Sequence, residues 1–169
     1  MPKTKKTVKI EPQIESIAEE IFEKMGITAQ IKVSHVVPAE QGEDKEKQTD
    51  HYLVEIQTEE SGLLIGHHGE TINSLQLILG VILYRKLGQW VRVVLDVGNY
   101  RKMREETIRE MVNRIISEVE QTGQSVELPY LSPLERRTVH LMLSGHKTVT
   151  SQSNGEGRNR KISIMPKGV

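Results

Sequence analysis

The spacing of apolar residues in this chain changes repeatedly between that of a helix and that of a strand. Apolar side chains recur three or four residues apart from Ile10 to Met25, and Gly26 follows, which predicts an amphipathic helix that ends at the glycine. The segments Ile31–Val37 and Tyr52–Ile56 follow a period of two, which predicts two strands, and the acidic segment Glu40–Asp50 between them predicts a solvated loop. Short helices and strands in alternation indicate an α+β fold.

A long helical run and a third strand follow. Residues from about Thr71 to Leu87 carry apolar side chains on nearly every face. One stripe is expected to meet the sheet and comprises Ile72, Leu75, Leu79, Ile82 and Leu83. The other faces carry Leu77, Ile78, Val81 and Tyr84. Such a helix needs a second cover, which either the rest of the chain or a partner chain would supply. Gly88 ends the helix, and Trp90–Val97 predicts the third strand.

The second half of the chain predicts a separate set of elements. A helix is expected over Tyr100–Gln121, followed by a short strand at Val126 and Leu128. Ser132-Pro133-Leu134-Glu135 is a strong helix start, with a serine cap, proline at the first position and glutamate completing a capping box. The residues of this helix that we expect to face inward are Leu134, Thr138, Leu141 and Met142. Residues 146–153 and 160–165 then predict a closing hairpin around a turn at 154–157.

Composition limits the classes of function. The chain has 169 residues and no cysteine. Without cysteine it has no disulfide framework, thiolate zinc site or cysteine nucleophile, and a cytoplasmic location is expected. Residues 1–9 are basic and are expected to form a flexible tail, but no apolar h-region follows them. No apolar run reaches the ~20 residues needed to cross a bilayer, so no membrane partner is expected.

Charge is unevenly distributed although the net charge is zero. Residues 1–98 contain 11 Lys and Arg against 15 Asp and Glu, a balance of −4, and residues 99–169 contain 12 against 8, a balance of +4. We therefore expect two domains, over residues 10–98 and 99–169, the second of which faces a polyanion. Random variation of surface charge is the alternative explanation.

The segment Gly66-His67-His68-Gly69 is the first candidate binding site. Its two glycines flank two residues between an apolar segment and a helix start, so a phosphate would meet backbone there without a Cβ in the way. The helix N-terminus around Thr71 offers unpaired N–H groups and the positive end of the helix dipole. A plain tight turn between two helices is the alternative.

The order of elements around this loop resembles the type II KH domain. That order is helix, strand, strand, short helix, Gly-x-x-Gly, long helix and strand, and residues 64–72 resemble the family signature. The resemblance implies a three-stranded sheet with helices on one face. It also implies that about four nucleotides of a single strand are clamped along the groove beside the loop.

The loop departs from the commonest family pattern, because His67 and His68 stand where Lys or Arg is usual. Exposed imidazoles are mostly neutral at pH 7, since their unperturbed pKa is about 6.5. Either affinity is weaker than usual, or a bound phosphate couples binding to proton uptake. We favour the second hypothesis, which requires RNA binding to tighten as the pH falls from about 8 to 6. No metal site is expected, because adjacent histidines in a loop tend to point apart and no His-Glu-x-x-His spacing is present.

A second candidate site lies in the basic half. Arg136 and His140 are one turn apart on a helix and point away from the expected inward stripe, so we expect neither to be needed for the core. A solvated basic pair is the alternative. Groups that suit phosphate surround them in the sequence, namely Arg137, Ser151, Ser153, Arg158, Arg160 and Lys161.

Residues 135–140 together with 153–160 resemble the R-three-H domain, a small sheet with helices named for its arginine, three spacers and histidine. The resemblance implies that Arg136 and His140 contact a single strand, with the basic hairpin beside them. A KH domain followed by an R-three-H domain resembles the bacterial Jag family, also called SpoIIIJ-associated proteins, over roughly residues 10–167. Asn99-Tyr100-Arg101 also resembles the family's junction. The N-terminal Jag domain of many members is not recognised in this sequence.

These features predict a non-enzymatic protein that binds single-stranded RNA, or single-stranded DNA, as an RNA chaperone or post-transcriptional regulator without a cofactor. Aromatic residues are few, so phosphate and polar contacts should dominate. Binding should weaken with salt, and replacing Arg136 or Lys161 should flatten that dependence. One alternative is a protein-interaction adaptor that uses its KH module to form a homodimer or to pair with another KH protein. A hydrolase using His140 with Glu135 or Asp96 lacks any supporting motif.

Overall fold

The chain forms two compact units, over residues 1–100 and 101–169, and each is described by itself. The computed structural model describes residues 10–37 and 50–168. The predicted basic tail at residues 1–9 lies outside the described residues, as does nearly all of the predicted acidic loop.

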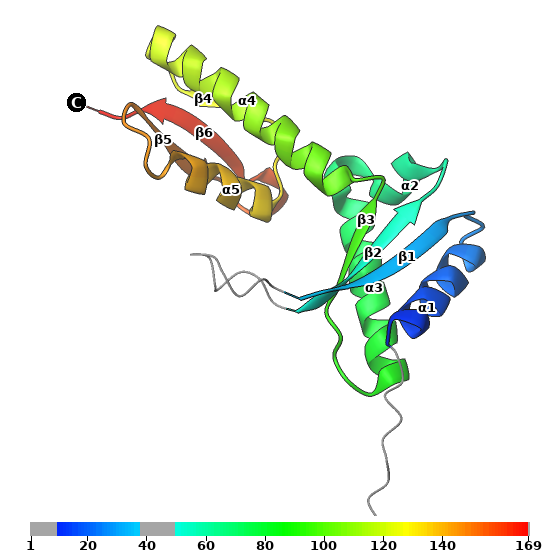
Figure 1. Ribbon diagram of the computed structural model, residues 1–169. Helices are drawn as coiled ribbons and strands as arrows, with labels where there is room; N and C mark the ends of the chain where they lie inside the picture. The colour runs from blue at the N-terminus through cyan, green and yellow to red at the C-terminus, as the bar shows by residue number, and fades with distance from the viewer. Residues whose placement is uncertain (1–9, 38–49, 169) are drawn as a thin grey trace, which may run out of the picture. The chain divides into compact units, whose positions relative to one another are not determined.

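The first unit is a three-stranded sheet with helices against it (Figure 1). In chain order its elements are α1 (Ile10–Lys24), β1 (Gln30–Val36), β2 (His51–Gln57), α2 (Ser61–Ile65), the 3₁₀ turn η1 (His67–Gly69), α3 (Glu70–Leu87) and β3 (Val93–Val97). The strand order is β1-β2-β3, with β1 antiparallel and β3 parallel to β2. All three predicted strands and both long helices are confirmed.

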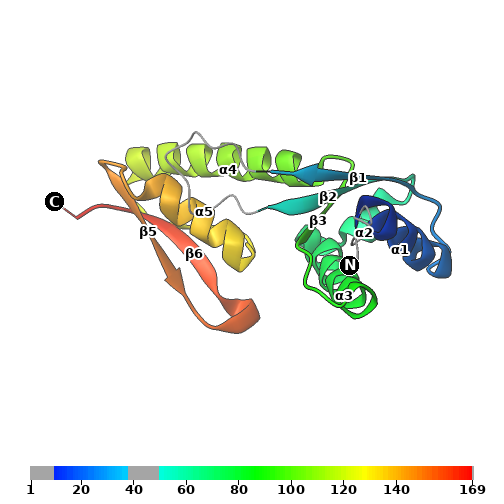
Figure 2. The same cartoon turned by 60° about the horizontal axis from the view of Figure 1, so that its bottom comes forward.

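Helices α1 and α3 lie on the same side of this sheet, as Figure 2 shows, and pack against β1, β3 and each other. The core between them includes Ile14, Phe22, Val54, Leu83 and Leu95, each at most 3% exposed. The strand β3 begins three residues later than predicted, because its pairing with β2 starts where Val93 lies opposite Tyr52. The predicted arrangement of a sheet with helices on one face is confirmed.

The helix α3 also exposes a second apolar face. Leu77, Ile78, Val81 and Tyr84 are between 45% and 64% exposed, and the ring of Trp90, itself 64% exposed, lies 6.2 Å from that of Tyr84. Within residues 10–37 and 50–168, no helix is long and apolar enough to cross a membrane. The four residues Leu77, Ile78, Val81 and Tyr84 are thus the apolar side chains for which the sequence predicted a second cover, and they are exposed in the first unit.

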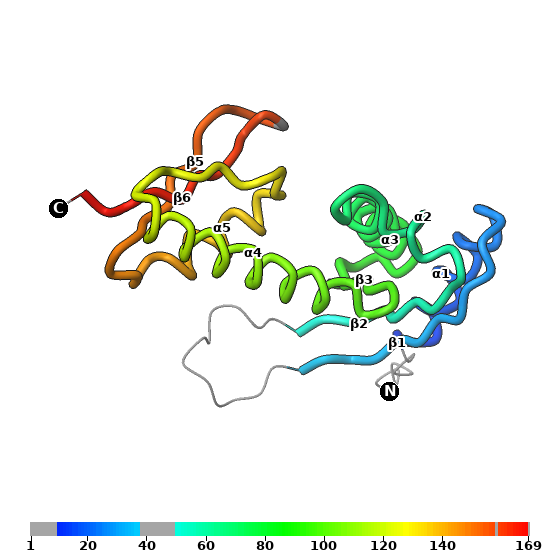
Figure 3. The backbone as a smooth tube through the Cα atoms, turned by 90° about the horizontal axis from the view of Figure 1, so that it is seen from above, coloured from blue at the N-terminus to red at the C-terminus, as the bar shows by residue number. Residues whose placement is uncertain are grey.

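The second unit packs two helices with another three-stranded sheet. Its elements are α4 (Tyr100–Thr122, whose first residue closes the first unit), β4 (Val126–Glu127), α5 (Pro133–Leu143), β5 (Val149–Asn154), the 3₁₀ turn η2 (Gly157–Asn159) and β6 (Lys161–Pro166). The strand order is β4-β6-β5, all antiparallel, and β5 and β6 run side by side as the predicted hairpin (Figure 3). Ile108 and Val112 of α4 share a core with Val139 of α5 and Ile162 of β6.

The inward face predicted for α5 is wrong except at Met142, which packs against the core. Leu134 is 73% exposed and Leu141 53% exposed, whereas the buried residues of the helix are Arg136, Val139 and Leu143. The two leucines of the predicted stripe point outward. The stripe that packs contains an arginine, which counts against it in any hydrophobic pattern.

Candidate nucleic-acid interface

The Gly-x-x-Gly loop requires glycine at both ends. Gly66 has φ +69° and ψ −173°, a combination that essentially only glycine adopts, and a Cβ there would lie 1.9 Å from Thr71 Oγ1. Gly69 has φ +82°, and a Cβ there would lie 3.0 Å from Cε1 of Tyr100. The loop is thus folded tightly on Thr71 and Tyr100, and neither glycine position accepts a larger residue without strain.

The long helix α3 starts immediately behind the loop. Its N-cap is Gly69, which has no side chain to accept a hydrogen bond from the first turn. An 18-residue helix that begins on a glycine presents its first-turn N–H groups and positive dipole end toward the loop. Glu70 in the first turn also complements that dipole, so its carboxylate competes with a phosphate for the same positive end.

The two histidines lie against each other rather than apart. Their ring centroids are 4.0 Å apart with the planes tilted by 60°, which contradicts the expectation that adjacent loop histidines diverge. The cause is backbone conformation, because His68 has φ +51°, in the left-handed region, and this turns its side chain toward His67. Among the described residues no group of three metal-ligating side chains gathers, here or elsewhere. The loop therefore carries two adjacent imidazole rings between its glycines.

In the second unit, His140 joins α5 to β5. Its Nδ1 lies 2.7 Å from Ser151 Oγ, and its Nε2 lies 2.8 Å from Ser153 Oγ. The two serines are two residues apart and therefore share one face of the strand. The structure brings together three of the predicted site residues, although no sequence pattern indicated that they would bond to one another.

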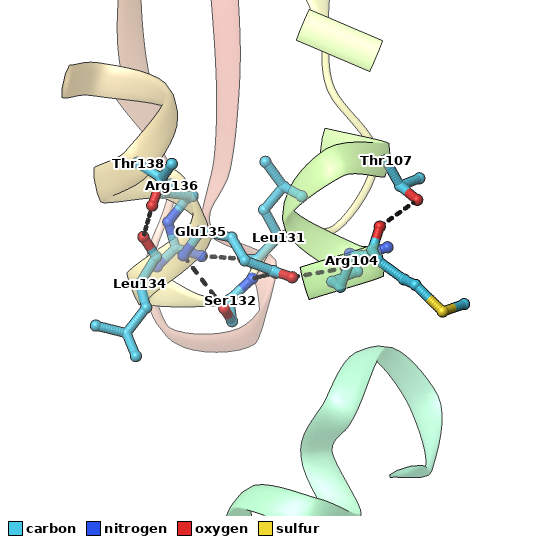
Figure 4. A network of polar contacts seen from close by, with 9 residues as sticks. Arg104, Thr107, Leu131, Ser132, Leu134, Glu135, Arg136 and Thr138 are labelled. Carbon is cyan, nitrogen blue, oxygen red and sulfur yellow. Dashed lines mark hydrogen bonds and ion pairs between the residues drawn. The ribbon is translucent and has the colours of Figure 1, made fainter. Parts of the chain in front are cut away.

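Arg136 is buried, which corrects the prediction that it faces solvent or a ligand. It is 8% exposed, and its Nη1 donates to the main-chain carbonyl of Leu131 at 2.6 Å (Figure 4). The same Nη1 donates to the main-chain carbonyl of Arg160 at 3.3 Å. These carbonyls precede α5 and β6 respectively. The guanidinium therefore connects two segments of the second unit from inside, and the expectation that the core does not need it is wrong.

The basic hairpin offers fewer open cations than its sequence suggests. Lys161 Nζ lies 2.6 Å from Glu127 Oε1 across the paired strands β6 and β4, so the positive charge is already partly balanced. Arg137 and Arg160 are exposed. The side chain of Arg158 lies outside the described residues. At the turn, a Cβ on Gly155 would lie 2.7 Å from the carbonyl oxygen of Asn159, so this glycine too is required.

Sequence reasoning missed an ion pair that fixes the start of α5. Glu135 completes the predicted capping box with Ser132 and also accepts from Nε of Arg104 in α4, at 2.7 Å (Figure 4). Burial raises the pKa of the Glu135 carboxyl, but the hydrogen bonds from Arg104 and from the Ser132 backbone outweigh it, so the pKa lies below its ordinary value. The ionised form therefore stabilises the folded second unit.

We predict that Glu135→Gln removes this stabilisation, about 1 kcal/mol at pH 7, while keeping the capping hydrogen bond that glutamine also makes. A carboxyl whose pKa is lowered on folding stabilises above its unfolded pKa and loses that effect as the pH falls through its folded pKa. Thermal unfolding should accordingly show a gap between variant and parent at pH 7 that closes as the pH falls below about 4. Glu127→Gln, at the exposed pair with Lys161, is the control and should change little. A gap that persists at pH 3 would contradict the assignment.

Comparison with known proteins then identifies both units. Residues 11–96 match the family model described as KhpA/KhpB, KH domain, and residues 106–166 match that of the R-three-H domain. The chain belongs to the KhpB family, also called Jag. Both models describe nucleic-acid-binding domains rather than catalytic ones, and the prediction of a non-enzymatic protein is confirmed.

Three curated KhpB proteins show how far the likeness extends. RNA-binding protein KhpB of Clostridium symbiosum is 32% identical over 149 residues, which are 88% of this chain and 63% of that protein. RNA-binding protein KhpB of Bacillus subtilis (strain 168) is 32% identical over 156 residues, 91% of this chain and 67% of that protein. RNA-binding protein KhpB of Lactiplantibacillus plantarum is 36% identical over 107 residues, 63% of this chain and 33% of that protein. The chain thus spans a third to two thirds of the length of these KhpB relatives.

Proposed function

We propose that this chain binds single-stranded RNA without catalysing a reaction, through a KH domain at residues 10–98 and an R-three-H domain at residues 99–169. The observation that carries the proposal is the Gly66–Gly69 loop, a tight glycine-bounded turn in front of an 18-residue helix, in a chain whose KH relatives are named RNA-binding proteins. The glycines would admit phosphates to the backbone, and apolar residues beside the loop would receive bases.

The second unit adds a separate set of phosphate-compatible groups. The hydroxyls of Ser151 and Ser153 and the exposed cations Arg137 and Arg160 lie on α5 and the hairpin. Two weak sites on one chain bind a long strand more tightly than either does alone, because the second contact is intramolecular. Weak, extended and sequence-tolerant binding of this kind fits an RNA chaperone or post-transcriptional regulator acting in the cytoplasm.

The test is the salt dependence of binding to a labelled single-stranded RNA of about 20 nucleotides, followed by fluorescence anisotropy. Each phosphate contact contributes about −0.7 to the slope of log K against log salt for a single strand, so three to five contacts predict a slope of roughly −2 to −3.5. The same oligonucleotide as single-stranded DNA measures the preference for RNA. Absence of binding at low salt, or affinity that does not change with salt, would contradict the proposal.

One observation favours a second candidate function, that of a protein-interaction adaptor. The exposed apolar face of α3, with Leu77, Ile78, Val81 and Tyr84, is available to a second KH domain, either of this chain or of another protein. Size-exclusion chromatography with light scattering, with and without the oligonucleotide, separates the two candidates. A monomer that forms a complex with RNA supports the binder, and an oligomer that ignores RNA supports the adaptor.

A further inference from the structure

We propose that the two residues of the Arg-x-x-x-His signature, Arg136 and His140, do not touch nucleic acid but hold in place the groups that do. This inference rests on the proposed function for its ligand, single-stranded RNA. Its structural half, that the side chains of Arg136 and His140 are engaged inside the second unit, stands on contacts within the chain.

Arg136 offers little of its side chain to a phosphate while it keeps its place in the fold. The residue is 8% exposed, and its Nη1 donates to two carbonyls from segments 29 residues apart, at Leu131 and Arg160. Turning the side chain outward would leave both carbonyls without this donor and remove a buried side chain from the second unit. The adjacent residue, Arg137, is exposed and has the same charge, so it meets a phosphate at no such cost.

The position of Arg160 shows what the buried guanidinium accomplishes. The carbonyl of Arg160 accepts from Arg136, whereas the side chain of Arg160 is exposed beside the Gly-rich turn. Arg136 thus fixes the backbone of a residue whose own cation is open to a ligand. Ordering a mobile side chain and its backbone on binding costs free energy. Because Arg136 already holds the backbone of Arg160 in place, less of this cost remains and the contact is tighter.

His140 is engaged at both ring nitrogens. A neutral imidazole has one donor and one acceptor, and both nitrogens lie within hydrogen-bond distance of a serine hydroxyl. The ring therefore has no polar atom left for a phosphate. Each serine hydroxyl keeps further hydrogen-bonding capacity, since it has one hydrogen and two lone pairs and the histidine uses only one of these. The hydroxyls of Ser151 and Ser153 are then the contact groups, and His140 orients them.

The neighbouring residues Arg136 and Arg137 allow a matched test of the role proposed for Arg136. In the full chain, Arg136→Met and Arg137→Met each remove one positive charge from the same helix. We expect Arg137→Met to leave the melting temperature unchanged and to make the salt slope less negative by about 0.7, as loss of one phosphate contact does. We expect Arg136→Met to lower the melting temperature by roughly 10 °C and RNA affinity by about fivefold, with the slope unchanged. Affinities are measured at a temperature at which each variant is folded.

Arg136→Lys separates charge from geometry and guards against a variant that fails to fold. Lysine keeps the charge but not the planar donors that bond the Leu131 and Arg160 carbonyls, so a positioning role predicts losses close to those of Arg136→Met. Near-parental affinity and slope in Arg136→Lys, or a slope in Arg136→Met that matches Arg137→Met, would overturn the inference. Equal melting temperatures for Arg136→Met and Arg137→Met would overturn it even if the chain bound no RNA.

A double-mutant cycle tests the role proposed for His140. If His140 acts only through the serines, then adding His140→Ala to Ser151→Ala/Ser153→Ala costs no further RNA affinity, although each change alone costs roughly threefold to tenfold. Fully multiplicative losses would show that the histidine contacts RNA itself and would overturn its positioning role. Loss of all RNA binding in the parent chain is a different outcome, since it refutes the proposed function while the melting temperatures still decide the role of Arg136.

Discussion

Replacing Gly66 by alanine should lower the free energy of unfolding of the first unit by about 3 kcal/mol. A Cβ at this position meets Thr71 at three points, with 1.9 Å to Oγ1, 2.6 Å to Cβ and 3.0 Å to the backbone nitrogen. Rotating the threonine relieves only the first of these contacts. The backbone conformation, φ +69° with ψ −173°, is also one that alanine adopts only under strain. The loop must therefore change shape, and we expect RNA affinity to fall along with stability.

Gly62→Ala is the matched control, four residues earlier in the chain. Gly62 lies in α2 with nothing within 4 Å of an added Cβ and no positive φ, so alanine should stabilise the helix by about 0.5–1 kcal/mol. Urea denaturation followed by tryptophan fluorescence measures both variants, because Trp90, the single tryptophan of the chain, belongs to the first unit. Equal stability of the two variants would show that the loop is not constrained as the structure indicates.

The sequence predicted the elements well because each depends on short-range patterns. The three strands of the first sheet, the helix α3 and the capped start of α5 all follow from spacing or from capping residues within a few positions. The loop was predictable for the same reason, since Gly66 and Gly69 stand directly before a helix. Such patterns cannot decide which of two comparable faces of a helix packs against the core. The helix α5 has two such faces.

The errors at the second site have one physical origin. A buried arginine is rare, so a hydrophobic pattern places Arg136 outside, whereas its hydrogen bonds to the carbonyls of Leu131 and Arg160 favour its burial. The pairing of Lys161 with Glu127 likewise joins residues that are far apart in sequence and adjacent only in the sheet. The residue types of the candidate site were therefore predictable from the sequence. Which of them are open to a ligand and which hold the others in place depends on contacts between residues far apart in the chain.

Placing negative charge in the loop gives the second large effect. We expect His67→Asp/His68→Asp to weaken binding of single-stranded RNA by about 30-fold, which corresponds to ~2 kcal/mol. At an effective dielectric constant of about 20, a carboxylate roughly 5 Å from a phosphate is repelled by ~3 kcal/mol, and salt screens part of this. Anisotropy titrations at low and at moderate salt measure the loss. It should be largest at low salt.

His67→Asn/His68→Asn is the control that isolates charge from shape. Asparagine and aspartate have the same size, and both tolerate the left-handed backbone of His68, so the two double variants differ only in charge. We expect the asparagine pair to retain most of the affinity at pH 8. It also tests the proton-uptake hypothesis, because a nearby phosphate favours the protonated imidazole and parental affinity should rise from pH 8 to pH 6 only while the histidines are present. Equal affinities for the aspartate and asparagine pairs would place the phosphates away from this loop and leave the second unit as the main contact.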